Sequence, residues 1–347
     1  MSSRQVLITG GAGFLGVHLT DRFRKAEMRV RLFDFAEPPP WAQEPGVEYM
    51  RRDTRNLAEV ISSLKGVDSV VHAAFSSPRE SLETLHSVNV DGTKNLCAGA
   101  IAQGVRRFIL ISSTIVLRPQ RVHPFFRDSP LTRLDMYRAT RVEAEEIVTR
   151  CGGKGLSVAI VRPKTFIGPS RVSAFEIIFD WVRCGRPVLI LGSGQNRYQL
   201  LDVRDMAEGI RLIEAAKGEG VFSLGAQEFQ TVREDLQMLL EHAKTEAQLR
   251  FVPGWIARAI VRGIELANMV PLSEWHAMSA DGEDSVMDIS RALKELGWRP
   301  ERSNAKALIE SYDWYVTNLM TTGKIGNKRP LPLAHRALDK ILSIFLP

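Results

Sequence analysis

The chain has 347 residues, 44% of them hydrophobic and 25% charged, so it can bury a large core as one large domain or two modest ones. No apolar run approaches the length that spans a bilayer, and no charged segment followed by an apolar one marks a secretory signal. Three widely spaced cysteines without a C-x-x-C pattern argue against a disulfide framework or a cysteine metal site. We expect a cytoplasmic protein.

The formal net charge of +6 belongs mainly to the end of the chain, because residues 321–347 alone carry a surplus of +4. Aromatic residues do not alternate with the basic ones, which argues against nucleic-acid binding. Apolar residues between Leu333 and Phe345 recur on one side of a helix, so we interpret 321–347 as a basic amphipathic tail. It would dock at the membrane periphery, contact a second subunit or pack against its own domain.

The first part of the chain alternates strand-like and helix-like segments. We predict strands at 5–9, 30–33, 47–50, 69–72 and 107–112, with helices from about residue 14 and near 57–64, 82–103 and 136–150. This alternation indicates an α/β fold with a Rossmann-type, doubly wound parallel sheet. Cofactor and substrate should meet at the carboxyl ends of its strands. We assign residues 1–160 to a nucleotide-binding Rossmann domain.

The second part has a looser pattern. We predict strands at 157–161, 188–191 and 198–201, and helices near 173–183, 203–216, 231–243, 254–267 and 304–319. We interpret 161–320 mainly as a smaller C-terminal substrate-binding cap, with segments such as 198–224 returning to the first domain. The apolar stretch 253–275 would line a greasy pocket or pack the core of the cap.

A glycine-rich loop directly follows the first predicted strand. It reads T-G-G-A-G-F-L-G from Thr9 to Gly16 and satisfies the spacing G-x-G-x-x-G. A side chain at Gly10 or Gly13 would block the turn or hold backbone amides away from a pyrophosphate. The pyrophosphate would bind at the N-terminus of the next helix. Glycines also serve tight turns, but this strand–loop–helix context favours dinucleotide binding.

Two acidic residues end the next strands. Asp34 stands eighteen residues after Gly16, where this fingerprint expects an acid that binds the adenosine ribose hydroxyls. A carboxylate there favours NAD over NADP, because it repels a 2′-phosphate. Asp53 either accepts a hydrogen bond from the adenine amino group or caps the following helix, and both interpretations stay open.

The fifth predicted strand runs into Ser112, Ser113 and Thr114, and Tyr137 follows with Arg141 four residues later. Residues four apart lie on one face of a helix, so Tyr137 and Arg141 can point at the same ligand. With these features the chain resembles the extended short-chain dehydrogenase/reductases. That family includes nucleotide-sugar epimerases and dehydratases and the 3β-hydroxysteroid dehydrogenases. The resemblance spans about 5–318 and adds these motifs: His72-Ala73-Ala74, Asn89-Val90-Asp91-Gly92-Thr93, Arg162-Pro163, Gly168-Pro169, Asp202 to Asp205, and Leu293 to Trp298.

The resemblance implies an NAD-dependent oxidoreductase or epimerase that acts on a secondary alcohol or ketone. In the catalytic set that it implies, Tyr137 moves a proton, Thr114 binds the same substrate oxygen and Arg141 supplies a cation. It assigns cofactor binding to Gly10, Gly13, Phe14, Leu15, Gly16, Asp34, Asp53, Thr54, Ala73, Ala74, Asn89, Ser112, Tyr137, Arg141 and Pro163. It assigns substrate binding to Phe75, Thr114, Thr165, Arg197 and Tyr198. We expect no metal, and we expect a homodimer.

Arg141 departs from the family, which normally has lysine there. A free tyrosine has a pKa of about 10, so proton transfer near pH 7 needs it lowered by about three units, roughly 4 kcal/mol. One cation at about 4 Å supplies roughly that much at an effective dielectric constant of about 20. Arginine keeps the charge on a wider, planar group. The site is then fully active, slow and specialised, or a non-catalytic NAD-binding regulatory site, and we favour an active enzyme.

Further departures concern the substrate. Nucleotide-sugar members commonly have asparagine where this chain has Thr165 and an aromatic residue at Ile167. They also have a diphosphate-binding arginine at Tyr198, whereas Arg197 stands one residue earlier. A nucleotide sugar nevertheless stays the first expectation, because it is the commonest substrate class of the family. The alternative is a dehydrogenase or ketoreductase of an apolar steroid, lipid or polyketide-like substrate.

Overall fold

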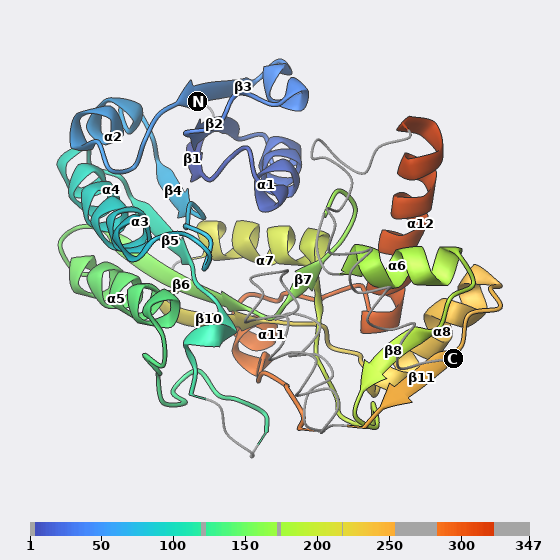
Figure 1. The fold of residues 1–347 in the computed structure, drawn as a ribbon. Helices are drawn as coiled ribbons and strands as arrows, with labels where there is room; N and C mark the ends of the chain where they lie inside the picture. Colours follow the sequence, from blue (N-terminus) through green and yellow to red (C-terminus); the bar gives the residue numbers. More distant parts are fainter. Residues whose placement is uncertain (1–3, 119–122, 172–174, 217, 254–282, 323–347) are drawn as a thin grey trace. The chain divides into compact units, whose positions relative to one another are not determined.

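The computed structural model describes residues 4–118, 123–171, 175–216, 218–253 and 283–322. The chain forms two compact units, coloured along the sequence in Figure 1. The first contains residues 1–166, 203–225 and 287–301, and the second contains 167–202, 226–286 and 302–347. The chain therefore leaves the first unit three times and returns to it twice.

A seven-stranded parallel sheet forms the centre of the first unit, with the strand order β10-β6-β5-β4-β1-β2-β3. Its strands are β1 (Gln5–Thr9), β2 (Arg29–Asp34), β3 (Val47–Arg51), β4 (Ser69–His72), β5 (Arg107–Ile111), β6 (Ser157–Pro163) and β10 (Gly220–Leu224). Such strands are buried on both faces, and β1, β4 and β5 are buried at every residue. The predicted Rossmann-type fold is confirmed.

Helices cover both faces of this sheet, as Figure 1 shows. They are α1 (Phe14–Lys25), α2 (Leu57–Ser63), α3 (Leu82–His86), α4 (Gly92–Ala102), α5 (Met136–Cys151), α7 (Val203–Ala215) and α11 (Ser290–Glu295). On one face α4 packs between α2 and α5, and on the other α1 packs against α7. The predicted helix 82–103 is interrupted, because the π-helical segment η2 (Ser87–Asp91) separates α3 from α4.

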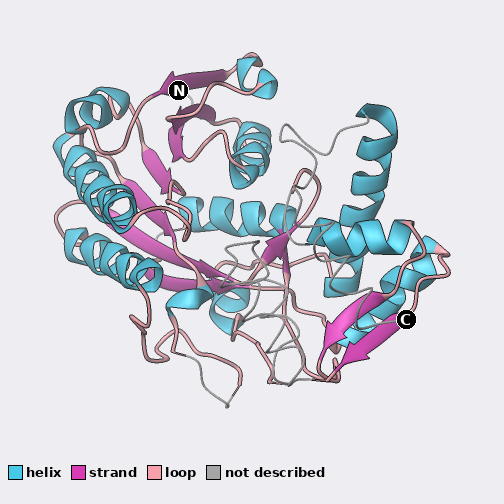
Figure 2. Ribbon diagram, viewed as in Figure 1, coloured by secondary structure: helices cyan, strands magenta, loops and turns pink. Residues whose placement is uncertain are grey.

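The second unit is built around three described helices, α6 (Phe175–Arg183), α8 (Val232–Ala243) and α12 (Asn304–Thr322), which Figure 2 shows in cyan. Strand β8 (Val188–Leu191) pairs in parallel with β11 (Leu249–Val252). A second two-stranded sheet joins β7 (Phe166–Ile167) to β9 (Leu201–Asp202). The core includes Phe179, Trp181, Leu239, Tyr312 and Tyr315.

Two predictions concern residues that the structure does not describe. The predicted helix at 254–267 and nearly all of the amphipathic tail lie outside the described residues. No helix of the described part is long and apolar enough to cross a membrane. Within the same residues, no group of three or more His, Cys, Asp or Glu side chains could hold a metal ion. Residues 198–200, predicted as part of a strand, lie outside β9, and Tyr198 pairs with Ser285 in an isolated bridge.

Candidate functional site

The glycine loop between β1 and α1 is too tight for side chains at three of its glycines, Gly10, Gly11 and Gly16. A Cβ atom at Gly16 would lie 2.1 Å from the carbonyl oxygen of Gly11, and one at Gly10 would lie 3.0 Å from the backbone of Ala73. Gly10 also has φ +69°, which favours glycine. Gly13 is the N-cap of α1, and no side chain caps the helix there. The first-turn amides therefore suit an anion.

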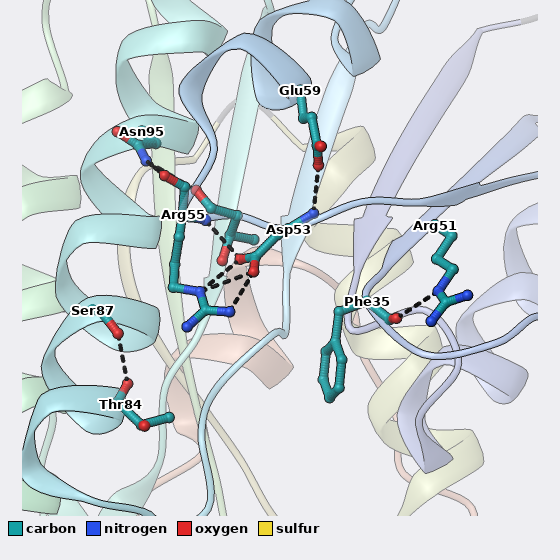
Figure 3. Close-up of polar contacts among 9 residues, drawn as sticks. Phe35, Arg51, Asp53, Arg55, Glu59, Thr84, Ser87 and Asn95 are labelled. Atoms are coloured by element: carbon teal, nitrogen blue, oxygen red, sulfur yellow. Dashed lines mark hydrogen bonds and ion pairs between the residues drawn. The ribbon is translucent and has the colours of Figure 1, made fainter.

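Asp34 is fixed by two backbone amides. One carboxylate oxygen accepts from Ala12 in the glycine loop and the other accepts from Ala36, each at 3.0 Å. An ionised carboxylate has about four acceptor positions, so capacity remains for the ribose hydroxyls. Phe35, the next residue, is 77% exposed, and its carbonyl oxygen accepts from Arg51 (Figure 3).

Asp53 lies in the turn after β3, and its carboxylate faces Arg55. The Arg55 guanidinium donates to both carboxylate oxygens at 2.5 to 3.0 Å, as Figure 3 shows. These hydrogen bonds from Arg55 hold the pKa of Asp53 below its ordinary value. The side chain that caps α2 is Asn56, which accepts from Ala58 and Glu59. The adenine contact of Asp53 stays a prediction.

A buried histidine fixes the two residues after β4. Ala73 and Ala74 donate their amides to Thr9 Oγ1, both at 3.2 Å, so the Thr9 hydroxyl donates to His72 Nδ1 at 2.8 Å. His72 Nε2 then donates to Thr93 Oγ1 at 3.0 Å, a tautomer assigned from this network. Burial, followed by the charge of Arg141, lowers the pKa of His72 to about 3, so the ring is neutral.

Asn89 connects the same segment to α5. It lies fully buried in η2, where its Oδ1 accepts from the Ser76 amide at 2.8 Å. Its Nδ2 donates to Thr140 Oγ1 at 3.0 Å. Thr140 lies between Tyr137 and Arg141 on α5, so Asn89 helps to fix the position of that helix.

Tyr137 and Arg141 lie one turn apart on α5 and are joined by a hydrogen bond. Asp135 caps α5 by accepting from the Arg138 amide at 2.8 Å, so Tyr137 lies in the first turn. Arg141, one turn later, donates to the Tyr137 hydroxyl at 2.9 Å and to the Ile111 carbonyl oxygen at 3.2 Å. The guanidinium of Arg141 therefore lies in direct contact with the Tyr137 hydroxyl.

Three hydroxyl side chains follow the end of β5. Ser112 Oγ is buried and has no hydrogen-bond partner among the described residues. Ser113 Oγ accepts from the Ile115 amide at 3.2 Å, which orients its hydroxyl. Thr114 begins the 3-10 turn η3 (Thr114–Val116) and is partly exposed. Ser113 therefore joins Thr114 as a candidate for the substrate oxygen.

All the cofactor-binding candidates lie in the first unit. They are found after β1 to β5, on α1 and α5, in η2 and at the end of β6, where Pro163 is buried. The aromatic ring of Phe14 stacks on Phe166 at 5.8 Å, and Leu15 is buried. Thr54 is buried beside Gly92, where an added Cβ would lie 2.6 Å from its Oγ1.

The substrate-binding candidates are divided between the two units. Thr165 and Phe75 belong to the first, where the Arg141 guanidinium lies 3.8 Å from the centroid of the Phe75 ring. Arg197 and Tyr198 belong to the second. Arg197 donates to Asp284 Oδ2 through Nε at 2.8 Å and through a terminal nitrogen at 2.6 Å, and Tyr198 is buried.

Sequence reasoning missed the partner of Arg197 and the ring beside Arg141. Asp284 lies 87 residues from Arg197, and no spacing rule connects the two. The Phe75 contact has no sequence signal either, because it joins a loop after β4 to the middle of α5. Lys164, whose sequence position suggested a solvated surface charge or a phosphate contact, is instead buried directly after β6, and burial lowers its pKa to about 7.

Residues 6–225 match the model of the NAD dependent epimerase/dehydratase family, which is more than half of the chain. The chain belongs to this family. It is 31% identical to the uncharacterized protein y4nG of Sinorhizobium fredii (strain NBRC 101917 / NGR234), over 94% of this chain and 82% of that protein. It is 26% identical to a 3-beta-hydroxysteroid dehydrogenase of Mycolicibacterium neoaurum, over 92% and 93% of the two chains.

Among solved structures, the fold is similar to a UDP-glucuronic acid 4-epimerase from Bacillus cereus in complex with NAD. The TM-score is 0.73 at 20% identity, covering 89% of this chain and 98% of the other. A UDP-glucose 4-epimerase from Thermotoga maritima gives 0.75 at 19% identity, covering 91% and 99%. At these identities the likeness establishes the fold alone.

Membership of the family makes the protein an NAD-dependent enzyme of the extended short-chain dehydrogenase/reductase type, with NAD as cofactor. The residues present fit that cofactor. Gly10 and Gly16 leave no space for a Cβ atom inside the turn, so the loop keeps the tight form that dinucleotide-binding loops use. The Nε atom of Arg141 is buried and has no hydrogen-bond partner in the described part of the chain, so it can serve a ribose hydroxyl.

Proposed function

We propose that this enzyme oxidises an apolar secondary alcohol, or reduces the corresponding ketone, in a substrate of the hydroxysteroid type. The observation that carries the substrate class is the ion pair between Arg197 and Asp284. Arg197 is the cation that the sequence offers for a nucleotide diphosphate, and its guanidinium is engaged by a carboxylate. A diphosphate would have to displace that carboxylate.

Two further observations support an apolar substrate. Ile167 stands where nucleotide-sugar members commonly have an aromatic residue, and it is 1% exposed in the core of the second unit. Relatives that align with nine-tenths of the chain are named 3-beta-hydroxysteroid dehydrogenases. A steroid offers a secondary hydroxyl on a rigid apolar frame, whose burial contributes about 25 cal/mol per Å² without any cation. The expectation of a nucleotide sugar stays an untested prediction.

Tyr137 and Arg141 then perform the proton transfer. The Arg141 guanidinium stabilises the Tyr137 phenolate, which accepts the proton of the substrate hydroxyl as the carbon–oxygen bond becomes a carbonyl. NAD would supply the hydride acceptor for the substrate carbon. A hydroxyl from Ser113 or Thr114 donates to the substrate oxygen. In ketone reduction the same groups act in reverse, and Tyr137 returns its proton.

The test combines cofactor identification with a substrate panel. Denatured protein is analysed for released nucleotide, and NADH formation is then measured with 3β-hydroxysteroids, simple apolar secondary alcohols and UDP-sugars. We expect turnover of an apolar alcohol, and Tyr137→Phe should lower kcat by about 10²- to 10⁴-fold. Turnover of hydroxysteroid that survives Tyr137→Phe unchanged would refute the mechanism.

Arg197→Ala is the control for the substrate class. Arg197 is paired with Asp284 and, under this proposal, does not contact the substrate, so we expect kcat/KM for the apolar alcohol to stay within about twofold of the parent protein. Loss of an exposed ion pair should also cost little folding stability. Turnover of UDP-sugars that Arg197→Ala abolishes would instead establish a nucleotide sugar as substrate. The homodimer and a contact made by the tail remain predictions.

A further inference from the structure

Three groups hold the Arg141 guanidinium, and one of them is an aromatic ring. Its terminal nitrogens donate to the Tyr137 hydroxyl at 2.9 Å and to the Ile111 carbonyl oxygen at 3.2 Å. Its central carbon, Cζ, lies 3.8 Å from the centroid of the Phe75 ring, which is close contact for a cation over an aromatic face. Phe75 and Arg141 are 66 residues apart in the sequence, so this contact is specific to the fold.

The ring supplies a constraint that the two hydrogen bonds lack. Two hydrogen bonds donated in the guanidinium plane fix the positions of the two donor nitrogens. The plane can still tilt about the line that joins these two nitrogens. An aromatic ring against the face of the guanidinium opposes this tilt, since arginine stacks on aromatic faces as well as donating in its own plane. The buried Nε has no hydrogen-bond partner in the described part of the chain, so no third acceptor there opposes the tilt.

The Phe75 ring is itself held in place. It stacks on the His72 ring, with centroids 5.1 Å apart and planes inclined by 26°. His72 cannot rotate freely, because Thr9 and Thr93 bind both of its ring nitrogens. The buried strand end thus supports Phe75, and Phe75 supports the arginine.

Resting on the proposed role of Tyr137, we propose that Phe75 is a positioning residue that holds the planar Arg141 guanidinium against the Tyr137 hydroxyl. The contact suits arginine because a guanidinium is flat, whereas the ammonium of a lysine is compact and has no plane to fix. Phe75 should therefore matter to catalysis when residue 141 is arginine and much less when it is lysine. This dependence separates positioning from simple packing.

The experiment is a double-mutant cycle at these two positions, with Phe75→Tyr as the conservative control. In the parent protein, Phe75→Leu keeps an apolar side chain but removes the ring, and we expect kcat near neutral pH to fall about tenfold. The low-pH limb of the kcat profile for alcohol oxidation should move up by about one pH unit, because a displaced cation stabilises the phenolate less. Phe75→Tyr keeps the aromatic ring and should retain parent behaviour.

In the Arg141→Lys protein, Phe75→Leu should change kcat by less than about twofold. Equal losses in both backgrounds would overturn the proposal, as would a Phe75→Leu protein whose low-pH limb does not move. Circular dichroism of each variant establishes that the fold is intact.

A second readout needs no substrate. The absorbance of tyrosinate is titrated against pH in each protein and in the same protein carrying Tyr137→Phe. Subtracting the second curve from the first isolates the signal of Tyr137 from those of the other tyrosines, since the chain has five. The midpoint of that signal should rise with Phe75→Leu only when residue 141 is arginine. If Tyr137→Phe leaves turnover intact while the midpoint still moves in this way, the proposed function fails and the positioning role stands. A midpoint that Phe75→Leu leaves unchanged overturns the positioning role whatever the substrate.

Discussion

Acidification should destabilise the first unit through His72. The ring is fully buried, and Thr9 can only donate to its Nδ1, because the amides of Ala73 and Ala74 occupy the acceptor positions of the Thr9 oxygen. A proton on Nδ1 would face the donor of Thr9 and would place a buried positive charge near Arg141. The folded state therefore excludes this proton, which the unfolded chain accepts readily.

The magnitude follows from the two pKa values. Histidine in an unfolded chain has a pKa of 6.5, and burial lowers that of His72 to about 3. Between these values the unfolded state binds more protons, so stability rises with pH there. The contribution of neutral His72 is complete above about pH 6.5 and is lost progressively towards pH 3. At about pH 5 the loss amounts to about 2 kcal/mol, at 1.36 kcal/mol per unit.

Urea unfolding of the parent and of His72→Gln, each at about pH 7.5 and about pH 5, measures this contribution. His72→Gln lowers stability at both pH values because it disturbs the contacts to Thr9 and Thr93. Its further loss on acidification should, however, be about 2 kcal/mol smaller than that of the parent. All other titrating groups are common to the two proteins and cancel in this difference. Equal losses on acidification in the two proteins would refute the reasoning.

Three further predictions concern single positions. Glu176 is 1% exposed, and burial raises its pKa from 4.5 to about 8. The protonated side chain therefore contributes its full stability below about pH 4.5, and this contribution is lost as the pH rises towards 8. Glu176→Gln should therefore stabilise the protein increasingly with pH, by up to about 3 kcal/mol at pH 7 in urea unfolding, and a gain that falls with pH would contradict this. Ser113→Ala should lower kcat by about 10²-fold, and Thr114→Val by less, because the Ile115 amide orients the Ser113 hydroxyl. The reverse order would return the role to Thr114. Gly16→Ala should abolish NAD binding or folding, since its Cβ would meet the Gly11 carbonyl oxygen at 2.1 Å, and NAD affinity by calorimetry checks this.

Local patterns were enough to predict the cofactor side of the site. The run Val6-Leu7-Ile8 before the glycines is a buried parallel strand, for which continuous apolar sequence is typical. The spacing of Tyr137 and Arg141 placed both on one face of a helix, and their side chains are in contact. Both inferences depend on residues that are close in sequence and on the fixed periods of strands and helices.

Features that depend on tertiary contacts could not be predicted in this way. The long apolar pattern at 82–103 is helical throughout, but the π-helical segment within it places Asn89 beside Ser76 and Thr140. The pairing of Arg197 with Asp284 joins two loops of the second unit, and neither residue carries a local sign of the other. From sequence alone, a charged residue near a binding motif is a candidate for contacting the substrate, because only the fold shows which residue it pairs with.

The substitution of lysine by Arg141 can now be interpreted in physical terms. The cation is still within hydrogen-bond distance of the Tyr137 hydroxyl, where the family's lysine is expected to act. What differs is the shape of the charged group, and the structure places an aromatic face and the Ile111 carbonyl oxygen where a planar group can use both. Arg141→Lys alone should therefore cost activity in this chain, because the ammonium keeps the charge but loses the contacts that orient it. The same substitution would restore activity only if the arginine were the defect.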